Sequence, residues 1–548
     1  MKKLACVLIL CLIAAALYAG PPMPGTKHGG CIHLPGTQAP FRSPSEYATD
    51  SSLQKISPLS PAVGGDRNIL VILVNFQDVT FNPSRTADYY KTFLGKEGEP
   101  AGSMTMRKYY QDMSGGKLNL TFTVIGPYTL DHDKAHYGTN EIKSDDMDMD
   151  TLVGDIAWEA VDKAITNNPS VFSAENLSNW DYDGDGTIDT FFVIHAGIGE
   201  EEYIDTDDIF SLRWSINYAY QRGRASHQYY SYGGKIFNDY TVEPEYLFST
   251  GKPPIGTFCH EYGHILGLVD LYDITYETVG TGTWSLMDLG SWGCNLSADP
   301  APLLAWEKYY LGWLTPTTIT PTARPQTFNF SDIESSKKAW KINLTDNGSQ
   351  YLILEGKKKN TTGTGWFVQE DGLLITHITE DILGVLWEYN AINYKRTGIH
   401  GIDVVEAASP YYETTGQGTL WQGEGSRTTT SCFRSDTKTT LMPYYGKTVA
   451  GIGLLVSLIF LHRKRKKLGI MLLICCLACF MACDLGGHSS HSGKILGLPN
   501  TNYYETTEIT SKTGISGITI TVNCPAGSSS GSFTVVKEKR SSVFSKDE

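Results

Sequence analysis

Two histidines four residues apart make the run from Gly256 to Asp270 the most constrained segment of the chain. In an α-helix, His260 and His264 project from one face, and each can direct a ring nitrogen at the same cation. At ~100° per residue, the apolar residues of this run gather on the opposite side. We therefore expect a helix with one metal-binding face and one core face, the latter formed by Ile255, Phe258, Tyr262, Ile265 and Leu266.

Glu261 lies beside the expected metal-binding face. A carboxylate in this place can accept a proton from zinc-bound water, whose pKa the metal lowers to about 7. Glu261 is therefore the candidate general base, and zinc is the expected cofactor.

A third metal ligand has to be found, because catalytic zinc usually takes three protein ligands and leaves one position open. Asp270 is the nearest good candidate, six residues after His264. Gly267 permits a left-handed turn that would bring Asp270 back to the same ion. Two competitors remain: Asp273, and Glu307, which only tertiary packing could deliver.

With its pattern His-Glu-x-x-His-x-x-Gly-x-x-Asp, the chain resembles the immune inhibitor A family of secreted bacterial metallopeptidases, which are metzincin-like. The resemblance implies that Met287 forms a methionine turn under the metal, whereas an ordinary core methionine is the alternative. No tyrosine follows Met287 at the spacing that some metzincins use, so the oxyanion stabiliser is unassigned. The resemblance extends from about residue 68 to about residue 407 and includes segments 69–76, 106–111, 114–118, 181–189, 282–288, 305–308, 311–313 and 372–377.

A second group of candidate ligands is an acidic loop with carboxylates at alternate positions and a glycine at its sixth position. Hard oxygen ligands in this arrangement are typical of calcium loops. Phe192 occupies the twelfth position, so the bidentate glutamate of an EF-hand is missing. A solvated acidic turn is the alternative to a calcium site formed by Asp181, Asp183, Asp185 and Asp189.

Composition and length favour a globular protein of at least two folded units, since the chain has 548 residues, 41% of them hydrophobic and 19% charged. A net charge of -14 argues against a nucleic-acid partner and suits an extracytoplasmic enzyme. We expect an α+β fold, with a catalytic domain followed by a β-rich, sandwich-like module. The expected divisions are a signal peptide (1–19), a propeptide or linker (20–67), the catalytic domain (68–316), the β-rich module (317–447), a membrane segment (448–483) and an extracytoplasmic tail (484–548).

Membrane attachment is predicted from two apolar runs, 449–461 and 468–483, which flank the basic hexapeptide 462–467. The positive-inside rule places this hexapeptide in the cytoplasm and both flanking regions outside. Each run is shorter than the 17 to 25 residues of a usual span. Buried core helices, and a lipoprotein-like signal with Cys483 as acceptor, are the alternatives.

Cysteine positions suggest two further roles in an oxidising compartment. Cys259 and Cys294 flank the zinc helix and the methionine turn, so they could form a disulfide. Cys31 lies in the expected propeptide, where a thiolate could occupy the open zinc position and keep the enzyme latent. An incidental cysteine is the alternative for Cys31.

These residues together predict a secreted, membrane-tethered zinc endopeptidase that acts on proteins or peptides. A catalytically inert adhesin or binding protein with a protease-like fold is the alternative from another class, although Glu261 beside both histidines argues against it. A zinc-dependent hydrolase of small amides or esters would share the same site.

Overall fold

The computed structural model describes residues 62–95, 104–142, 148–202, 205–273, 280–293, 296–361, 365–387, 390–393, 400–405, 508–509, 518–524 and 528–537. The signal peptide, the propeptide with Cys31, and both apolar runs of the predicted membrane segment lie outside these ranges. Among the helices that fall within them, none combines the length and apolar composition that a bilayer crossing requires.

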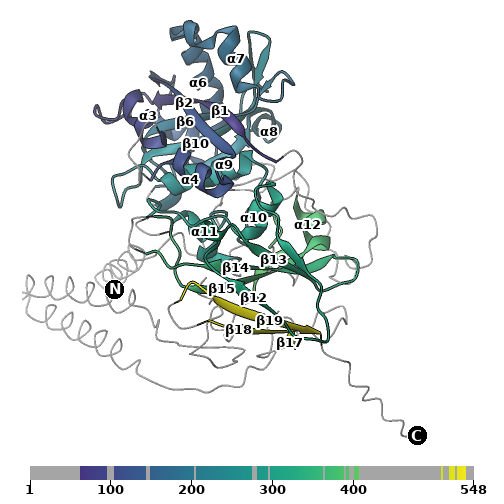
Figure 1. The fold of residues 1–548 in the computed structure, drawn as a ribbon. Helices are drawn as coiled ribbons and strands as arrows, with labels where there is room; N and C mark the ends of the chain where they lie inside the picture. The colour runs from purple at the N-terminus through teal and green to yellow at the C-terminus, as the bar shows by residue number, and fades with distance from the viewer. Residues whose placement is uncertain are drawn as a thin grey trace, which may run out of the picture. The chain divides into compact units, whose positions relative to one another are not determined.

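A five-stranded sheet forms the centre of the catalytic domain (Figure 1). Four of its strands run parallel to their neighbours, and β7 at one edge is antiparallel. The long apolar runs of β1 and β6 suit strands that are covered on both faces. The spatial order is β2 (Leu118–Thr129), β1 (Gly65–Asn75), β6 (Phe191–Ile198), β10 (Asp239–Tyr246) and β7 (Leu212–Ser215).

Alternation along β1 directs its side chains into two different cores. Ile69 and Val71 belong to one buried cluster, whereas Leu70 and Ile72 belong to the other. Strand residues alternate between faces, so a continuous apolar strand requires helices on both sides of the sheet. The first cluster includes α3 (Ala87–Gly95), α4 (Met106–Ser114) and α9 (Ile255–Ile265), and the second includes α6 (Val153–Asn167), α7 (Ala174–Trp180) and α8 (Ile216–Gln221).

Shorter elements complete the catalytic domain. The strands are β3 (Asn140–Ile142), β4 (Asp148–Asp150), β5 (Thr187–Ile188), β8 (Tyr230–Tyr232) and β9 (Lys235–Phe237). The α-helices are α5 (Lys134–Gly138) and α10 (Ala305–Tyr310), and the 3-10 turns are Pro169–Phe172, Glu200–Glu202, Gly282–Trp284 and Leu289–Ser291.

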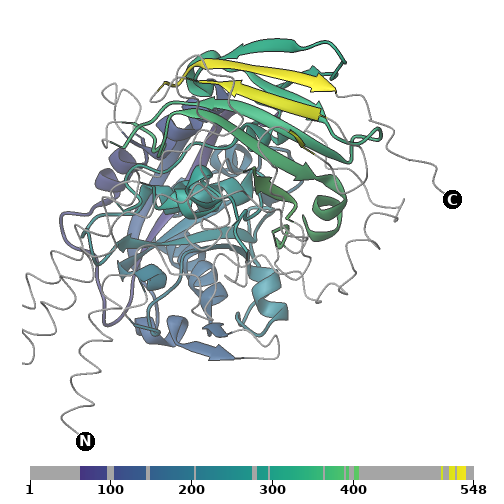
Figure 2. The ribbon, with the colours of Figure 1, turned by 90° about the horizontal axis from the view of Figure 1, so that it is seen from below.

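The β-rich module is a sandwich of two sheets around its own apolar core (Figure 2). Strand β12 pairs antiparallel with β19, so segments about two hundred positions apart meet in one sheet. The expected tail therefore supplies strands to the module instead of lying apart from it. One sheet contains β11 (Thr317–Ile319), β13 (Ala339–Asn343), β14 (Gln350–Lys357), β15 (Gly372–Thr379) and β16 (Ile402–Val404), and the other β12 (Gln326–Phe330), β19 (Gly531–Lys537), β18 (Ile518–Asn523) and β17 (Glu508–Ile509).

The larger sheet of the sandwich packs its second face into the core of the catalytic domain. Ile353 of β14 and Leu374 of β15 belong to the same buried cluster as Phe258 of α9. Ile333 of α11 (Ile333–Ser336) and Ile382 of α12 (Glu380–Leu386) join this cluster too. The sandwich and the catalytic domain therefore share one hydrophobic core.

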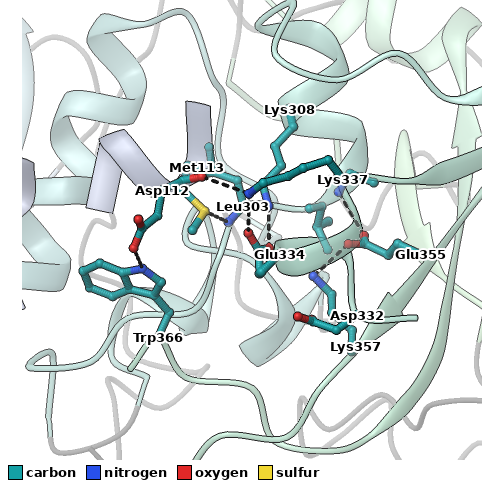
Figure 3. Close-up of polar contacts among 12 residues, drawn as sticks. Asp112, Met113, Leu303, Lys308, Asp332, Glu334, Lys337, Glu355, Lys357 and Trp366 are labelled. Atoms are coloured by element: carbon teal, nitrogen blue, oxygen red, sulfur yellow. Dashed lines mark hydrogen bonds and ion pairs between the residues drawn. The ribbon is translucent and has the colours of Figure 1, made fainter. Parts of the chain in front are cut away.

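Polar contacts reinforce this shared core, as Figure 3 shows. The buried Lys308 of α10 forms an ion pair with Glu334 of α11. The indole nitrogen of Trp366 donates a 2.9 Å hydrogen bond to the carboxylate of Asp112 in α4. These contacts join elements of the catalytic domain to the module that follows it.

Candidate metal centre

Helix α9 carries the histidine pair and has the two expected faces. Phe258 and Tyr262 are buried in the shared core. The backbone N–H of Gly256, near the start of the helix, donates to the carbonyl oxygen of Ser297 at 2.8 Å. His260, Glu261 and His264 are also buried. The expected metal-binding face therefore contacts other parts of the protein and has little contact with solvent.

The side chains of His260, His264 and Asp270 converge. Oδ1 of Asp270 lies 3.1 Å from Nε2 of His260 and 3.4 Å from Nε2 of His264. Two imidazole nitrogens and one carboxylate oxygen form a donor set that suits zinc. All three residues are buried, so this donor set is held away from bulk solvent.

Backbone carbonyls fix the orientation of both imidazole rings. Nδ1 of His260 lies 2.9 Å from the carbonyl oxygen of Leu286, and Nδ1 of His264 lies 2.9 Å from that of Leu268. Each Nδ1 can donate only if it carries the proton, which leaves the lone pair on Nε2 for a metal. The chain thus selects the tautomer that a metal ligand requires.

The turn after α9 returns the chain to the histidines as expected. Gly267 has φ of 96°, and its N–H donates to the carbonyl oxygen of His264 at 2.9 Å. The N–H of Leu268 donates to the carbonyl oxygen of Gly263 at 3.0 Å, which completes a Schellman motif. Glycine adopts this backbone conformation without steric cost, so the helix ends here and Asp270 can face His264.

The charges of these side chains shift the pKa values of His260 and Asp270 in opposite directions. Burial alone would lower the pKa of His260, but the hydrogen bond and charge of Asp270 outweigh it and raise the pKa to about 9. Burial would raise the pKa of Asp270, but the charge of His264 and hydrogen bonds from both histidines hold it well below its ordinary value. The cluster therefore accommodates positive charge, and a metal ion would have to displace the proton of His260.

Met287 packs against the helix that carries the histidines. A Cβ atom at Gly263 would lie only 2.6 Å from Sδ of Met287, so glycine permits this close approach. The N–H of Leu271 donates to the carbonyl oxygen of Met287 at 2.8 Å. Met287 thus contacts both the helix and the loop that follows it.

The two other candidate ligands, Glu307 and Asp273, do not converge with the histidines. Glu307 accepts hydrogen bonds from the hydroxyl of Ser285 and the N–H of Leu304, and it is not part of the convergent cluster. Asp273 is buried but likewise does not join the cluster. Of the carboxylates weighed from sequence, Asp270 is the one that converges with the histidines.

Comparison with known proteins shows similarity over the part of the chain that carries this cluster. Residues 63–314 match the family described as immune inhibitor A peptidase M6, catalytic domain. This part of the chain is therefore similar to the immune inhibitor A peptidases. The pre-pro-metalloprotease PrtV of Vibrio cholerae serotype O1 is 28% identical in an alignment of 278 positions that covers 44% of this chain and 29% of PrtV. Immune inhibitor A of Bacillus thuringiensis subsp. alesti is 31% identical in an alignment of 274 positions that covers 43% of this chain and 39% of that protein.

The chain thus spans less than half the length of the curated relatives that it matches. The matched residues end before the β-rich module begins at β11. They include α9, Asp270 and Met287.

The acidic loop of this peptidase domain forms a second convergent cluster. Carboxylate oxygens of Asp181, Asp183 and Asp189 lie within 4.8 Å of one another. Lys235 forms an ion pair with Asp181. Asp185 does not join the cluster, and its carboxylate accepts the N–H of Thr187 at 2.7 Å.

Cys259 of the peptidase domain is not in a disulfide, so the suggested pair with Cys294 is wrong. Its thiol points into the apolar core together with Phe258 and Tyr262. Burial raises the pKa of this thiol well above its ordinary value, which makes it unreactive. Cys294 itself lies outside the described residues.

One residue that contacts the metal cluster was not predicted. Asn390 lies far outside the family match and hydrogen-bonds to Asp270. Its neighbours in sequence carry no motif that points to the metal site. Only the tertiary structure brings it there.

Proposed function

We propose that this chain is a zinc endopeptidase that hydrolyses peptide bonds in proteins. The convergence of His260, His264 and Asp270 beside Glu261 is the observation that supports this function most strongly. The buried donor set, with both histidine tautomers selected by backbone carbonyls, fits zinc. The similarity of residues 63–314 to the immune inhibitor A peptidase domain supports this proposal.

When bound, zinc supplies Lewis acidity, which polarises a substrate carbonyl and acidifies water. His260, His264 and Asp270 would hold the metal. The carboxylate of Glu261 would accept the proton of the attacking water and pass it to the leaving amine. Met287 and the Schellman turn at Gly267 keep the ligands in place around α9.

Calcium binding at Asp181, Asp183 and Asp189 is a further part of this proposal. Three converging carboxylates suit a hard cation, and Lys235 already supplies positive charge to one of them. Calcium would compete with Lys235 for Asp181. Binding there would stabilise the loop that precedes the buried strand β6.

We place the enzyme outside the cytoplasm because residues 1–19 have the pattern of a signal peptide. The proposed membrane attachment through 449–483 and the latency role of Cys31 rest on sequence alone, since both lie outside the described residues. Protein or peptide substrates follow from the proposed reaction.

A digestion assay tests the function. Purified full-length protein should cleave casein, lose the activity to a zinc chelator, and recover it when zinc is restored. Zinc bound in stoichiometric amount without cleavage of casein or gelatin would favour the inert binding protein. Cleavage of small amides or esters alone would favour the small-molecule hydrolase.

A further inference from the structure

Asn390, which follows α12 in the β-rich module, contacts Asp270 twice. Its carboxamide Oδ1 accepts the backbone N–H of Asp270 at 2.6 Å, and its Nδ2 donates to Oδ2 of the same residue. Only one orientation of the amide satisfies both contacts, because the backbone donates and the carboxylate accepts. Oδ1 of Asp270 is thereby left to face His260 and His264.

The segment that carries Asn390 is itself held firmly. Asn390 is only 2% exposed and has φ of 49°, a left-handed conformation that asparagine adopts more readily than most residues. Asn393 donates through Nδ2 to the carbonyl oxygen of Leu271 at 2.7 Å and accepts the N–H of Ile402 in β16 at 3.0 Å. The segment therefore links the sandwich to the loop that carries Asp270.

We propose that Asn390 is a positioning residue of the metal centre, which orients the Asp270 carboxylate so that one oxygen faces the two histidines. This inference rests on the proposed zinc function. Residues that hydrogen-bond to a metal ligand fix its rotamer, and their loss typically costs 10- to 100-fold in metal affinity. Asn390 fixes Asp270 at both the backbone and the side chain.

The β-rich module is therefore part of the catalytic unit. The family match ends at residue 314, so a chain cut there retains all three ligands and loses the amide that orients one of them. Ile353 and Leu374 of the sandwich are buried in the same core as residues of α9. This packing fixes the module that carries Asn390 against the helix that carries the histidines. The metal centre is built from both parts of the protein.

Two substitutions in the full-length protein test this role. Asn390→Asp keeps an acceptor for the Asp270 N–H but removes the donor and places two carboxylates together. Asn390→Gly removes both hydrogen bonds and suits the left-handed backbone. Asn393→Ala is the matched control, because it breaks a contact to Leu271 in the same segment without touching Asp270.

Zinc affinity is measured by competition with a chromogenic chelator, and ligand geometry by the visible spectrum of the cobalt-substituted protein. Both Asn390 variants should bind zinc about 10- to 100-fold more weakly and change the cobalt spectrum. Asn393→Ala should lower the melting temperature, shift zinc affinity less than about 3-fold, and keep the parent spectrum.

Parent-like zinc affinity and spectrum in both Asn390 variants would overturn the inference while leaving the zinc function intact. An equal loss of affinity in Asn393→Ala would also overturn it, because the effect would then be general loosening of the segment. A parent protein that binds no zinc would refute the proposed function, and this inference with it.

Discussion

The hydroxyl of Ser285 lies 3.0 and 2.9 Å from the two carboxylate oxygens of Glu307. The same hydroxyl accepts the N–H of Met287 at 3.0 Å, and Glu307 also accepts the N–H of Leu304. Glu307 is therefore linked through Ser285 to the backbone of Met287. Its carboxylate does not join the cluster of His260, His264 and Asp270.

Asp270→Ala should lower zinc affinity by more than ~100-fold, because it removes a direct ligand. Glu307→Ala and Asp273→Ala should cost at most about 10- to 100-fold, since neither carboxylate joins the cluster. Zinc content and affinity of the three variants, measured side by side, check this assignment. Normal zinc binding by Asp270→Ala together with loss in Glu307→Ala would show that the assignment is wrong.

Glu261→Gln should retain zinc and lose nearly all hydrolysis, because the ligands remain while the proton acceptor is gone. General-base catalysis typically contributes about 10²- to 10⁴-fold in rate. Casein cleavage and zinc content of the variant are measured on the same preparation. Undiminished cleavage would refute the proposed role of Glu261.

Calcium should raise the melting temperature of the protein, because a ligand that binds only the native state stabilises it, by about 2.7 kcal/mol at a hundred times its dissociation constant. Asp183→Asn should abolish the increase, since Asp183 is in the cluster. Asp185→Asn is the control and should retain most of it, because Asp185 lies outside the cluster. Identical melting curves with calcium and with a calcium chelator would count against the site.

Glu307 should make stability fall as pH rises from about 4.5 to about 7. Burial, the largest cause, raises the pKa of Glu307 from 4.5 to about 7 in the folded protein. The folded state therefore holds this proton more tightly than the unfolded state, and the stabilisation present below pH 4.5 is lost as pH rises through 7.

Thermal unfolding of the parent and of Glu307→Gln between pH 4.5 and 8 measures this effect. The melting temperature of the parent relative to that of Glu307→Gln should fall as pH rises, because the glutamine does not ionise. Glu175→Gln, at an exposed carboxyl in α7, should leave the pH profile unchanged. A constant difference between parent and Glu307→Gln across the range would contradict the prediction.

A tag placed after Glu548 should be accessible on the same side of any membrane as the catalytic domain. Strands β12 and β19 pair in one sheet, so residues 326–330 and 531–537 lie in the same compartment. Protease protection of the tag in intact cells, with the catalytic domain accessible, would refute this topology. Surface labelling of the same cells detects the tag and the catalytic domain.

Local sequence was sufficient to predict the helix that carries His260 and His264 and the turn at Gly267, because helical spacing and a left-handed glycine are properties of a few consecutive residues. The acidic loop was predicted less completely. Alternation suggested four equal carboxylates, but only Asp181, Asp183 and Asp189 of the four converge. Which carboxylates meet depends on the path of the loop backbone, which spacing in the sequence does not give.

Contacts between distant segments lay beyond sequence reasoning. The pairing of β12 with β19 depends on which strand edges meet, and a short alternating strand fits many partners. Cys259 faces the core because of how α9 rotates against the sheet, whereas proximity in the chain suggested a disulfide. Asn390 reaches Asp270 only because the two parts of the protein share a core.

The contact between Asn390 and Asp270 also has a consequence for the timing of synthesis. The two residues are 120 positions apart, so at 5 to 20 residues per second the ligand precedes its orienting amide by roughly 6 to 24 s. During that interval the nascent chain contains His260, His264 and Asp270 with the carboxylate still unanchored. A metal centre that receives its orienting amide from a later module therefore reaches its full metal affinity only after that module has been made.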